Sequence, residues 1–430
     1  MEPRLQLRYR QLVLEHLRVS DPVAAGIHAL AVPGLADGFA AVIGAHRFLY
    51  NDSATLPRLI EPLHQLARQW RQQAPRSWGL VVHDWSLLSY PSHQRKTDQT
   101  KVNNGRGYEL TTLLLVEGSA GQPVAPLEVR LRSAKGVFSS RTPAPGKKAY
   151  RIDEVLHSMQ AVADVGLDGP LVHVIDREAD ALAPYRAWQA AGQHFLVRAR
   201  GSRKVRRQGE ELSLADLAGR LSFRRCREVT YKGHKAVQHV AEAEVVLDRP
   251  AWRHRRRGGR VINERVPGPP ITLRLVVSRV CDPSGRTLAV WYLLTNLPAE
   301  VDTATAALWY YWRWRIESLF KLLKSDGQQV EHWKQPDGEV IAKRLVVAAM
   351  ACALVWRLER QPSAEAVALR SLLVRLSGRQ MKWGKESTAP ALLAGLWVLL
   401  AMLEALEQHS VEELRRFKQL VLGTAEEDSG

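Results

Sequence analysis

The chain has 430 residues, 46% of them hydrophobic and 24% charged, a globular composition long enough for several domains. Its 61 Lys and Arg against 44 Asp and Glu give a net charge of +17 and a pI near 10, so a large polyanion is the expected partner. Three widely spaced cysteines exclude a disulfide framework and a cysteine zinc site. The start, MEPRLQLRYR, lacks the apolar core of a signal peptide, so we expect a reducing cytoplasm.

Residues 1–75 are expected to be helical, with breaks at Pro22, Pro33 and Pro57. The basic stretch near the start makes this region a candidate for binding DNA ends. From residue 78 the pattern changes to short apolar runs typical of strands, mixed with helical periodicity, which predicts a mixed α/β layer with helices on a sheet. The expected strands are 80–85, 108–118, 126–134, 171–176 and 194–200, and the expected helices are 151–166 and 179–192.

A strongly basic region follows. Residues 198–265 contain 19 Lys and Arg against 8 Asp and Glu, with RHRRRGGR (253–260) expected as an exposed loop. Alternating apolar residues at 271–280 and 287–296 predict antiparallel strands. This pattern indicates a β-rich insertion that faces a polyanion.

The C-terminal part is expected to be helical. Residues 302–327 predict one helix, capped by Asp302 or Thr303 and ended by Gly327. The apolar runs 345–356 and 391–403 are too short to span a bilayer and predict buried helices, with a polar break at 378–387.

The helix at 302–327 carries an unusual stripe. At 100° per residue, Tyr310, Arg313, Glu317 and Lys324 fall within about 60° of one another, with Trp314 and Lys321 just beyond. A solvated face would explain the stripe through i,i+4 pairs of Glu317 with Arg313 and Lys321, which contribute only about 0.2–0.5 kcal/mol each.

Two aspartates favour a different explanation. Asp84 ends the apolar run LVVHD, and Asp176 ends the buried run LVHVID. Three carboxylates that converge at a sheet edge, with Glu317 as the third, would bind two divalent cations and leave positions for phosphate and water. In so basic a protein the natural substrate is a phosphodiester.

Other acids and histidines compete for the same role. Asp98 and Asp153 are weaker candidates than Asp84, because neither follows an apolar strand. Glu178 and Asp180 share the motif of Asp176 but are expected to enter the next helix. His83 and His173 lie in apolar runs and are expected to be satisfied core histidines.

These motifs resemble a known family. The spacing Tyr310, Arg313, Glu317, Lys324 matches the YREK signature of bacterial insertion-sequence transposases of the insertion-sequence-four family. DREAD (176–180) resembles the stretch around that family's second catalytic aspartate, and WYLLTN (291–296) resembles the strand before its YREK helix. The resemblance covers about residues 78–335. Asp84 departs from the family's pattern, because Trp85 and Ser86 follow it.

The resemblance implies a DDE transposase with an RNase H-like core and roles for particular residues. Asp84, Asp176 and Glu317 would be the catalytic, metal-binding triad for two Mg²⁺ or Mn²⁺ ions. Arg313, Lys324 and Tyr310 would contact the DNA backbone, together with Lys321. Trp291 aligns with a tryptophan on which a flipped base stacks during hairpin formation, and Trp314 is expected to assist it.

The predicted fold class is α/β, an RNase H-like mixed sheet with flanking helices, interrupted by a β-rich insertion, with helical N- and C-terminal regions. The expected function is cut-and-paste DNA transposition by cleavage at transposon ends, a hairpin intermediate and strand transfer. The expected partners are double-stranded DNA at terminal inverted repeats, target DNA and a second copy of the chain, with no membrane, at the bacterial nucleoid. Alternatives are an inactive DNA-binding protein of this fold and an RNase H-like nuclease.

The sequence also predicts the division of the chain into regions. The expected regions are 1–75 helical, 76–200 first part of the core, 201–298 basic insertion, 299–335 second part of the core, and 336–430 helical and dimerising.

Overall fold

The computed structural model describes residues 1–18, 43–102, 105–148, 151–257, 260–381 and 385–422. The predicted breaks at Pro22 and Pro33 lie outside these residues. The chain divides into two compact units, each described by itself below. The sheet unit comprises residues 60–88 and 98–319, and the helical unit comprises residues 1–59, 89–97 and 320–430.

Five strands form the centre of the sheet unit. They lie in the order β4 (Pro123–Arg132), β3 (Gly105–Glu117), β1 (Gly79–Ser89), β7 (Leu171–Ile175) and β8 (Phe195–Ala199). β7 is parallel to β1 and to β8, whereas β3 and β4 are antiparallel. Both faces of the central strands are buried, which is why their sequences read as continuous apolar runs. This is the strand arrangement of the predicted RNase H-like core.

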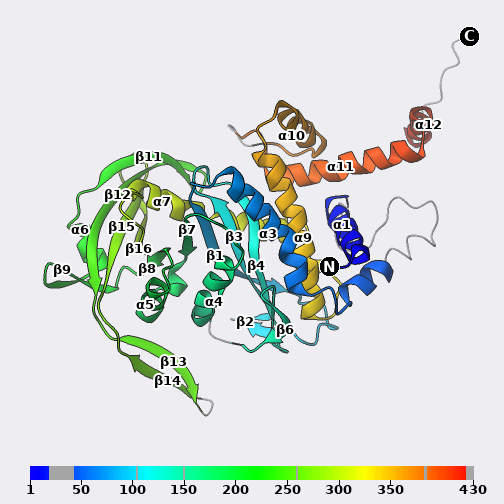
Figure 1. The fold of residues 1–430 in the computed structure, drawn as a ribbon. Coiled ribbons are helices and arrows are strands. Elements are labelled where there is room, and N and C mark those ends of the chain that lie inside the picture. Colours follow the sequence, from blue (N-terminus) through cyan, green and yellow to red (C-terminus); the bar gives the residue numbers. More distant parts are fainter. Residues whose placement is uncertain (19–42, 103–104, 149–150, 258–259, 382–384, 423–430) are drawn as a thin grey trace, which may run out of the picture. The chain divides into compact units, whose positions relative to one another are not determined.

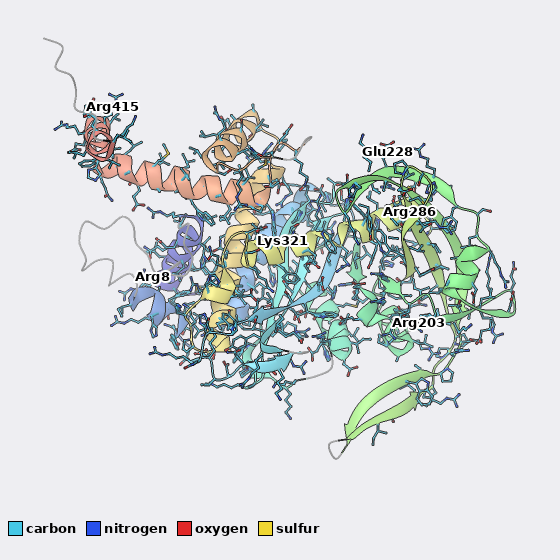
Figure 2. All side chains as sticks on the ribbon, turned by 180° about the vertical axis from the view of Figure 1, so that it is seen from behind. Arg8, Arg203, Glu228, Arg286, Lys321 and Arg415 are labelled. Carbon is cyan, nitrogen blue, oxygen red and sulfur yellow. The ribbon has the colours of Figure 1, made fainter. Side chains whose placement is uncertain are left out.

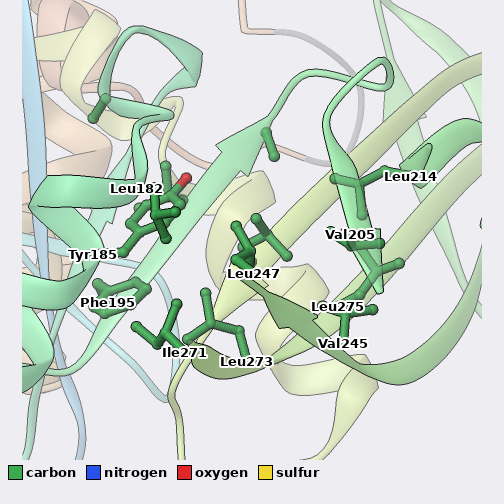
Figure 3. Packing of buried hydrophobic residues seen from close by; sticks show 14 of the residues in the cluster. Leu182, Tyr185, Phe195, Val205, Leu214, Val245, Leu247, Ile271, Leu273 and Leu275 are labelled. Carbon is green, nitrogen blue, oxygen red and sulfur yellow. The ribbon is translucent and has the colours of Figure 1, made fainter. Parts of the chain in front are cut away.

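Helices cover this sheet. α4 (Arg151–Ala163) precedes β7, and α5 (Leu182–Ala190) connects β7 to the parallel strand β8. Tyr185 and Trp188 of α5 pack with Phe195 of β8 in a large apolar cluster, in which Figure 3 labels Tyr185 and Phe195. This cluster extends without interruption into strands from the basic region, so both parts share one hydrophobic core.

The predicted insertion continues the same sheet. β16 (Thr287–Thr295) pairs antiparallel with β8, and β15 (Ile271–Cys281), β12 (His234–Leu247) and β11 (Arg224–Tyr231) follow in turn (Figure 1). The side chains of Glu228 on β11 and of Arg286 in the turn before β16, both labelled in Figure 2, are exposed. The mixed sheet with its flanking helices and β-rich insertion confirms the predicted fold class. The smaller elements of this unit are β2 (Thr100–Val102), β5 (Val137–Ser139), β6 (Thr142–Gly146), β9 (Lys204–Arg207), β10 (Glu210–Ser213) and α6 (Leu214–Gly219).

The prediction of an exposed loop at 253–260 is wrong, because strands occupy this stretch. β13 (Ala251–Arg257) and β14 (Arg260–Val266) pair antiparallel as a separate two-stranded ribbon. The run of arginines hides the strand pattern, because charge density alone favours an exposed loop.

The prediction of a single helix at 302–327 is also wrong. The stretch forms two helices, α7 (Thr303–Trp312) and α8 (Arg315–Leu323). Asp302 caps α7, as predicted, by accepting a hydrogen bond from the Thr305 amide at 2.6 Å. At the junction the amides of Arg313, Trp314, Ile316 and Glu317 each donate to the carbonyl three residues earlier, so the chain tightens into a turn of 3₁₀ type.

The helical unit brings the N-terminal helix together with the C-terminal ones. α1 (Pro3–Arg18) packs against α9 (Gly338–Arg360) and α11 (Ala389–Gln408), and α10 (Ala364–Leu376) packs against α9 and α11. α9 is buried along most of its length, which confirms the prediction for 345–356. α3 (Leu56–Gln73) runs from this unit into the sheet unit, and α12 (Val411–Leu422) ends the described chain.

The prediction that 391–403 forms a buried helix is wrong for its second half. α11 continues to Gln408, and Val398, Met402, Leu403 and Leu406 are exposed. Among the described helices, α11 is the one whose length and composition would also allow it to cross a membrane, and one third of its most apolar window is buried.

The sheet unit yields a test of strand packing. A Cβ atom on Gly107 of β3 would lie 2.1 Å from the Leu88 carbonyl oxygen of β1, and neither backbone can move without disturbing the sheet. Gly107→Ala should therefore destabilise the protein by about 2 kcal/mol or more in chemical denaturation. Gly219→Ala is the matched control, because nothing lies within 4 Å of the added atom. Equal stability of the two variants would contradict the close approach of β1 and β3.

Candidate active site

Strand register places three charged residues in a row. His83 of β1 is the partner of Ile175 of β7, and Ile175 is the partner of Val197 of β8. One residue further along each parallel strand stand Asp84, Asp176 and Arg198. Asp84 and Asp176 are therefore neighbours at the carboxyl ends of adjacent strands, as their sequence positions predicted.

Arg313 joins the two aspartates. Its Nη1 donates to Asp84 Oδ2 at 2.7 Å, and its Nη2 lies 3.5 Å from Asp176 Oδ2. Arg313 is only 7% exposed. It reaches this position from the junction of α7 and α8, so the tightened turn of the chain presents the arginine to the sheet edge.

The two carboxyl groups are electrostatically different. Burial raises the pKa of Asp84, and the nearby Arg313 only partly opposes this rise. Burial also acts to raise the pKa of Asp176, but Arg313, the Arg177 amide and the Tyr310 hydroxyl outweigh it and lower the pKa. The pKa of Arg313 is raised: burial acts to lower it, but Tyr310, Asp84 and Asp176 outweigh that effect. The site thus holds a charged arginine between two carboxyl groups.

Tyr310 contacts the same site from α7. Its hydroxyl donates to Asp176 Oδ1 at 3.0 Å, and its ring is buried. Trp291 of β16 lies edge-on to Tyr310 with ring centroids 5.6 Å apart. The Trp291 ring centroid also lies 6.4 Å from that of Tyr311 and 6.5 Å from that of Tyr231, so Trp291 belongs to an aromatic cluster that reaches the aspartates through Tyr310.

The other predicted site residues lie further along the chain. Glu317 is in the first turn of α8 and is half-buried. Trp314 is 64% exposed. Lys321 and Lys324 belong to the helical unit, where Lys324 Nζ lies 3.7 Å from a Glu331 carboxylate oxygen. The structure therefore brings together Asp84, Asp176, Arg313 and Tyr310, with Trp291 beside Tyr310.

The remaining acids of the DREAD motif have structural partners. Asp180 is buried and accepts hydrogen bonds from the Tyr185 hydroxyl at 3.0 Å and the Arg200 amide at 2.9 Å, and it pairs with Arg203. Glu178 pairs with Arg151 at 3.1 Å. Both lie in or cap the short 3₁₀ turn after β7 rather than the next helix, α5, which begins only at Leu182.

Other candidate ligands are occupied elsewhere. Asp98 is buried and accepts a hydrogen bond from the Tyr108 hydroxyl. Asp153 lies in the first turn of α4. His83 and His173 are buried and share a hydrogen bond of 2.8 Å, and burial lowers the pKa of His173 to about 3. The prediction that both are satisfied core histidines is confirmed.

Sequence reasoning missed Arg198. Its Nη1 lies 3.6 Å from Asp176 Oδ1, at the end of β8. The signal was present, because HFLVRAR was expected as a strand next to LVHVID, and aligning the two apolar runs sets Arg198 beside Asp176.

The chemistry of the donor set fits a divalent cation in part. Two carboxylates at neighbouring register positions supply the oxygen ligands that Mg²⁺ and Mn²⁺ prefer, and they already share one bound positive charge. Among the residues that the structure describes, no group of three His, Cys, Asp or Glu side chains is gathered closely enough to hold a metal. Asp84 and Asp176 are thus the assembled part of the site.

Comparison with known proteins adds little. No family model and no curated protein matches the chain. Among solved structures, the chain is similar to the piggyBac transposase in a cryo-EM structure of its synaptic complex with hairpin DNA, at 10% sequence identity and a TM-score of 0.38. The match covers 100% of this chain and 78% of that one. A likeness this distant does not identify a family.

Asp180 and Asp176 should differ in their effect on stability. Asp180→Ala removes a buried partner of Arg203 and should lower the free energy of unfolding by about 3 kcal/mol. Asp176→Ala should cost less than about 1 kcal/mol, because Asp176 is partly exposed and Arg313 keeps its bond to Asp84. Urea denaturation of both variants measures the difference. Losses of equal size would mean that Asp176 is a structural residue too.

Proposed function

We propose that this protein is a DNA transposase that cleaves and joins phosphodiester bonds with divalent metal ions. The observation that supports it best is the pair Asp84 and Asp176 on adjacent parallel strands, bound by the arginine and tyrosine of the YREK stretch. Two aspartates from strand ends and two residues of the YREK signature thus meet in one place, although 134 positions separate Asp176 from Tyr310.

Asp84, Asp176 and Glu317 would hold two Mg²⁺ or Mn²⁺ ions. When bound, such ions activate water or a 3′-hydroxyl and stabilise the leaving oxygen. Tyr310 would hold Asp176 in place through its hydroxyl, and Arg313 would bind a phosphate oxygen of the cleaved strand. Because metal-assisted displacement needs no protein nucleophile, Tyr310 would position Asp176 and would not attack the phosphodiester.

Binding of DNA would depend on the basic extension of the sheet. The excess of cations over residues 198–265 favours phosphate contacts that tolerate any sequence. Lys321, Lys324 and Trp314 would contribute further contacts near the YREK stretch. We also propose terminal inverted repeats and target DNA as the substrates, at the nucleoid of a bacterial cytoplasm.

Assembly of two subunits at paired DNA ends would use α11. Its exposed apolar residues Val398, Met402, Leu403 and Leu406 form a surface that a second copy of the chain could cover.

Alanine substitution tests the triad. Asp84→Ala, Asp176→Ala and Glu317→Ala should each reduce Mg²⁺- or Mn²⁺-dependent cleavage of a duplex carrying the element's own end by about a thousandfold or more, while binding in a gel-shift assay is kept. Glu228→Ala, at an exposed position of β11, is the control and should cleave normally.

Normal cleavage by Asp84→Ala would show that another residue is the first ligand. Cleavage without strand transfer in the unaltered protein would favour the RNase H-like nuclease, and binding without cleavage would favour the inactive protein.

Trp291 should act after the first cut. A hairpin at a DNA end unstacks at least one base, at a cost of a few kcal/mol, and an aromatic platform offsets about 1–3 kcal/mol of it. Trp291→Ala should therefore nick the first strand at a normal rate but accumulate nicked DNA and form few hairpins, as followed on denaturing gels. An end that already lacks the flipped base should partly restore hairpin formation. Equal slowing of nicking and hairpin formation would contradict the stacking role.

A further inference from the structure

One contact in the site conflicts with the proposed chemistry. Arg313 donates to Asp84 Oδ2 and approaches Asp176 Oδ2, the same carboxylates that would bind metal. A guanidinium and a divalent cation compete for these oxygens, because their charges repel at so short a distance and the Oδ1 atom of each aspartate already accepts another hydrogen bond. Metal binding is therefore stronger when Arg313 leaves at least one of them.

The contact is well formed. The guanidinium is almost fully buried, and two neighbouring carboxyl groups would repel each other without a cation between them. Arg198 lies near Asp176 alone, at 3.6 Å, so Arg313 is the described cation that bridges the pair. A metal ion must compete with Arg313 for the two carboxylates. The stronger the contacts of Arg313, the lower the apparent affinity of the protein for the metal.

The position of Arg313 in the chain suits exchange. It stands at the junction of α7 and α8, where hydrogen bonds of i→i−3 type replace the regular helical ladder. A long arginine side chain at such a junction can change its partner without moving the sheet. A phosphate oxygen is a strong alternative partner, because guanidinium groups bind phosphate in a bidentate manner.

We propose that Arg313 is an exchangeable counterion, which neutralises Asp84 and Asp176 in the DNA-free protein and moves to a DNA phosphate when DNA binds. The exchange frees the carboxylates for metal, so DNA and metal each raise the affinity for the other by the same factor. This proposal rests on the proposed function, since it assumes that the two aspartates hold metal and that DNA reaches the site. Arg313 thus lowers the affinity for metal until substrate is in place.

Mn²⁺ binding to the full-length protein tests the exchange without any cleavage. Free Mn²⁺ is measured by electron paramagnetic resonance, with and without a short blunt-ended DNA duplex. We expect the duplex to raise the Mn²⁺ affinity of the unaltered protein about tenfold. Arg313→Met should raise the affinity of the DNA-free protein by a similar factor and abolish most of the effect of the duplex. Arg315→Met, which removes the same charge near Tyr311, is the matched control and should behave like the unaltered protein.

One further variant, a double substitution, separates the possible failures. Asp84→Asn combined with Asp176→Asn measures Mn²⁺ held by DNA or by other parts of the protein, and this background is subtracted. If that double variant binds Mn²⁺ as well as the unaltered protein does, with duplex present, the aspartates hold no metal and the proposed function fails with the exchange. If the aspartates bind Mn²⁺ but neither DNA nor Arg313→Met changes the affinity, the exchange alone is wrong. The measurement on the unaltered protein decides the matter even if Arg313→Met does not fold.

Discussion

The parallel pairing of β1, β7 and β8 is the constraint on which the site depends. The pairs His83 with Ile175 and Ile175 with Val197 fix which residues stand next to each other at the strand ends. A slip of one residue would turn Asp84 or Asp176 to the opposite face of the sheet. The register is secured from inside, because both faces of these strands are buried and the cross-strand bond between His83 and His173 ties β1 to β7. The core thus positions the carboxylates before any ligand is present.

The extension of the sheet brings the chain back to the strand ends that carry Asp84 and Asp176. β16 pairs with β8 from Tyr292 to Thr295, and α7 begins eight residues later. This connection sets Tyr310 and Arg313 against aspartates that lie far earlier in the sequence. The β-rich insertion therefore has a structural role as well as a charged surface, because the pairing of β16 with β8 fixes where α7 begins. Trp291 lies in the middle of β16, which explains why it touches Tyr310.

Much of the sheet and its principal residues could be predicted from the sequence. Apolar runs in the sequence predict buried strands. An aspartate directly after such a run marks where the buried part of the strand ends, as at Asp84 and Asp176. Periodicity could not reveal the break between α7 and α8, because the apolar residues on both sides keep a helical spacing through a turn of 3₁₀ type. Nor could a helical wheel show that Arg313 points at the aspartates, since that contact joins segments separated by 229 positions. The exposed half of α11 was missed because apolar composition does not distinguish a buried face from an uncovered one.

The shared sheet also has a consequence for synthesis. β8 ends at Ala199, but the strand that completes its open side, β16, begins only at Thr287. Translation proceeds at about 5–20 residues per second, so the edge of β8 waits on the order of 5–20 s for its partner on every ribosome. An unpaired edge is a template for pairing with the wrong chain. Newly made copies on one messenger RNA therefore have a window for misassembly that closes only when the last strand of the extension emerges, so slow and sparse expression favours correctly folded protein.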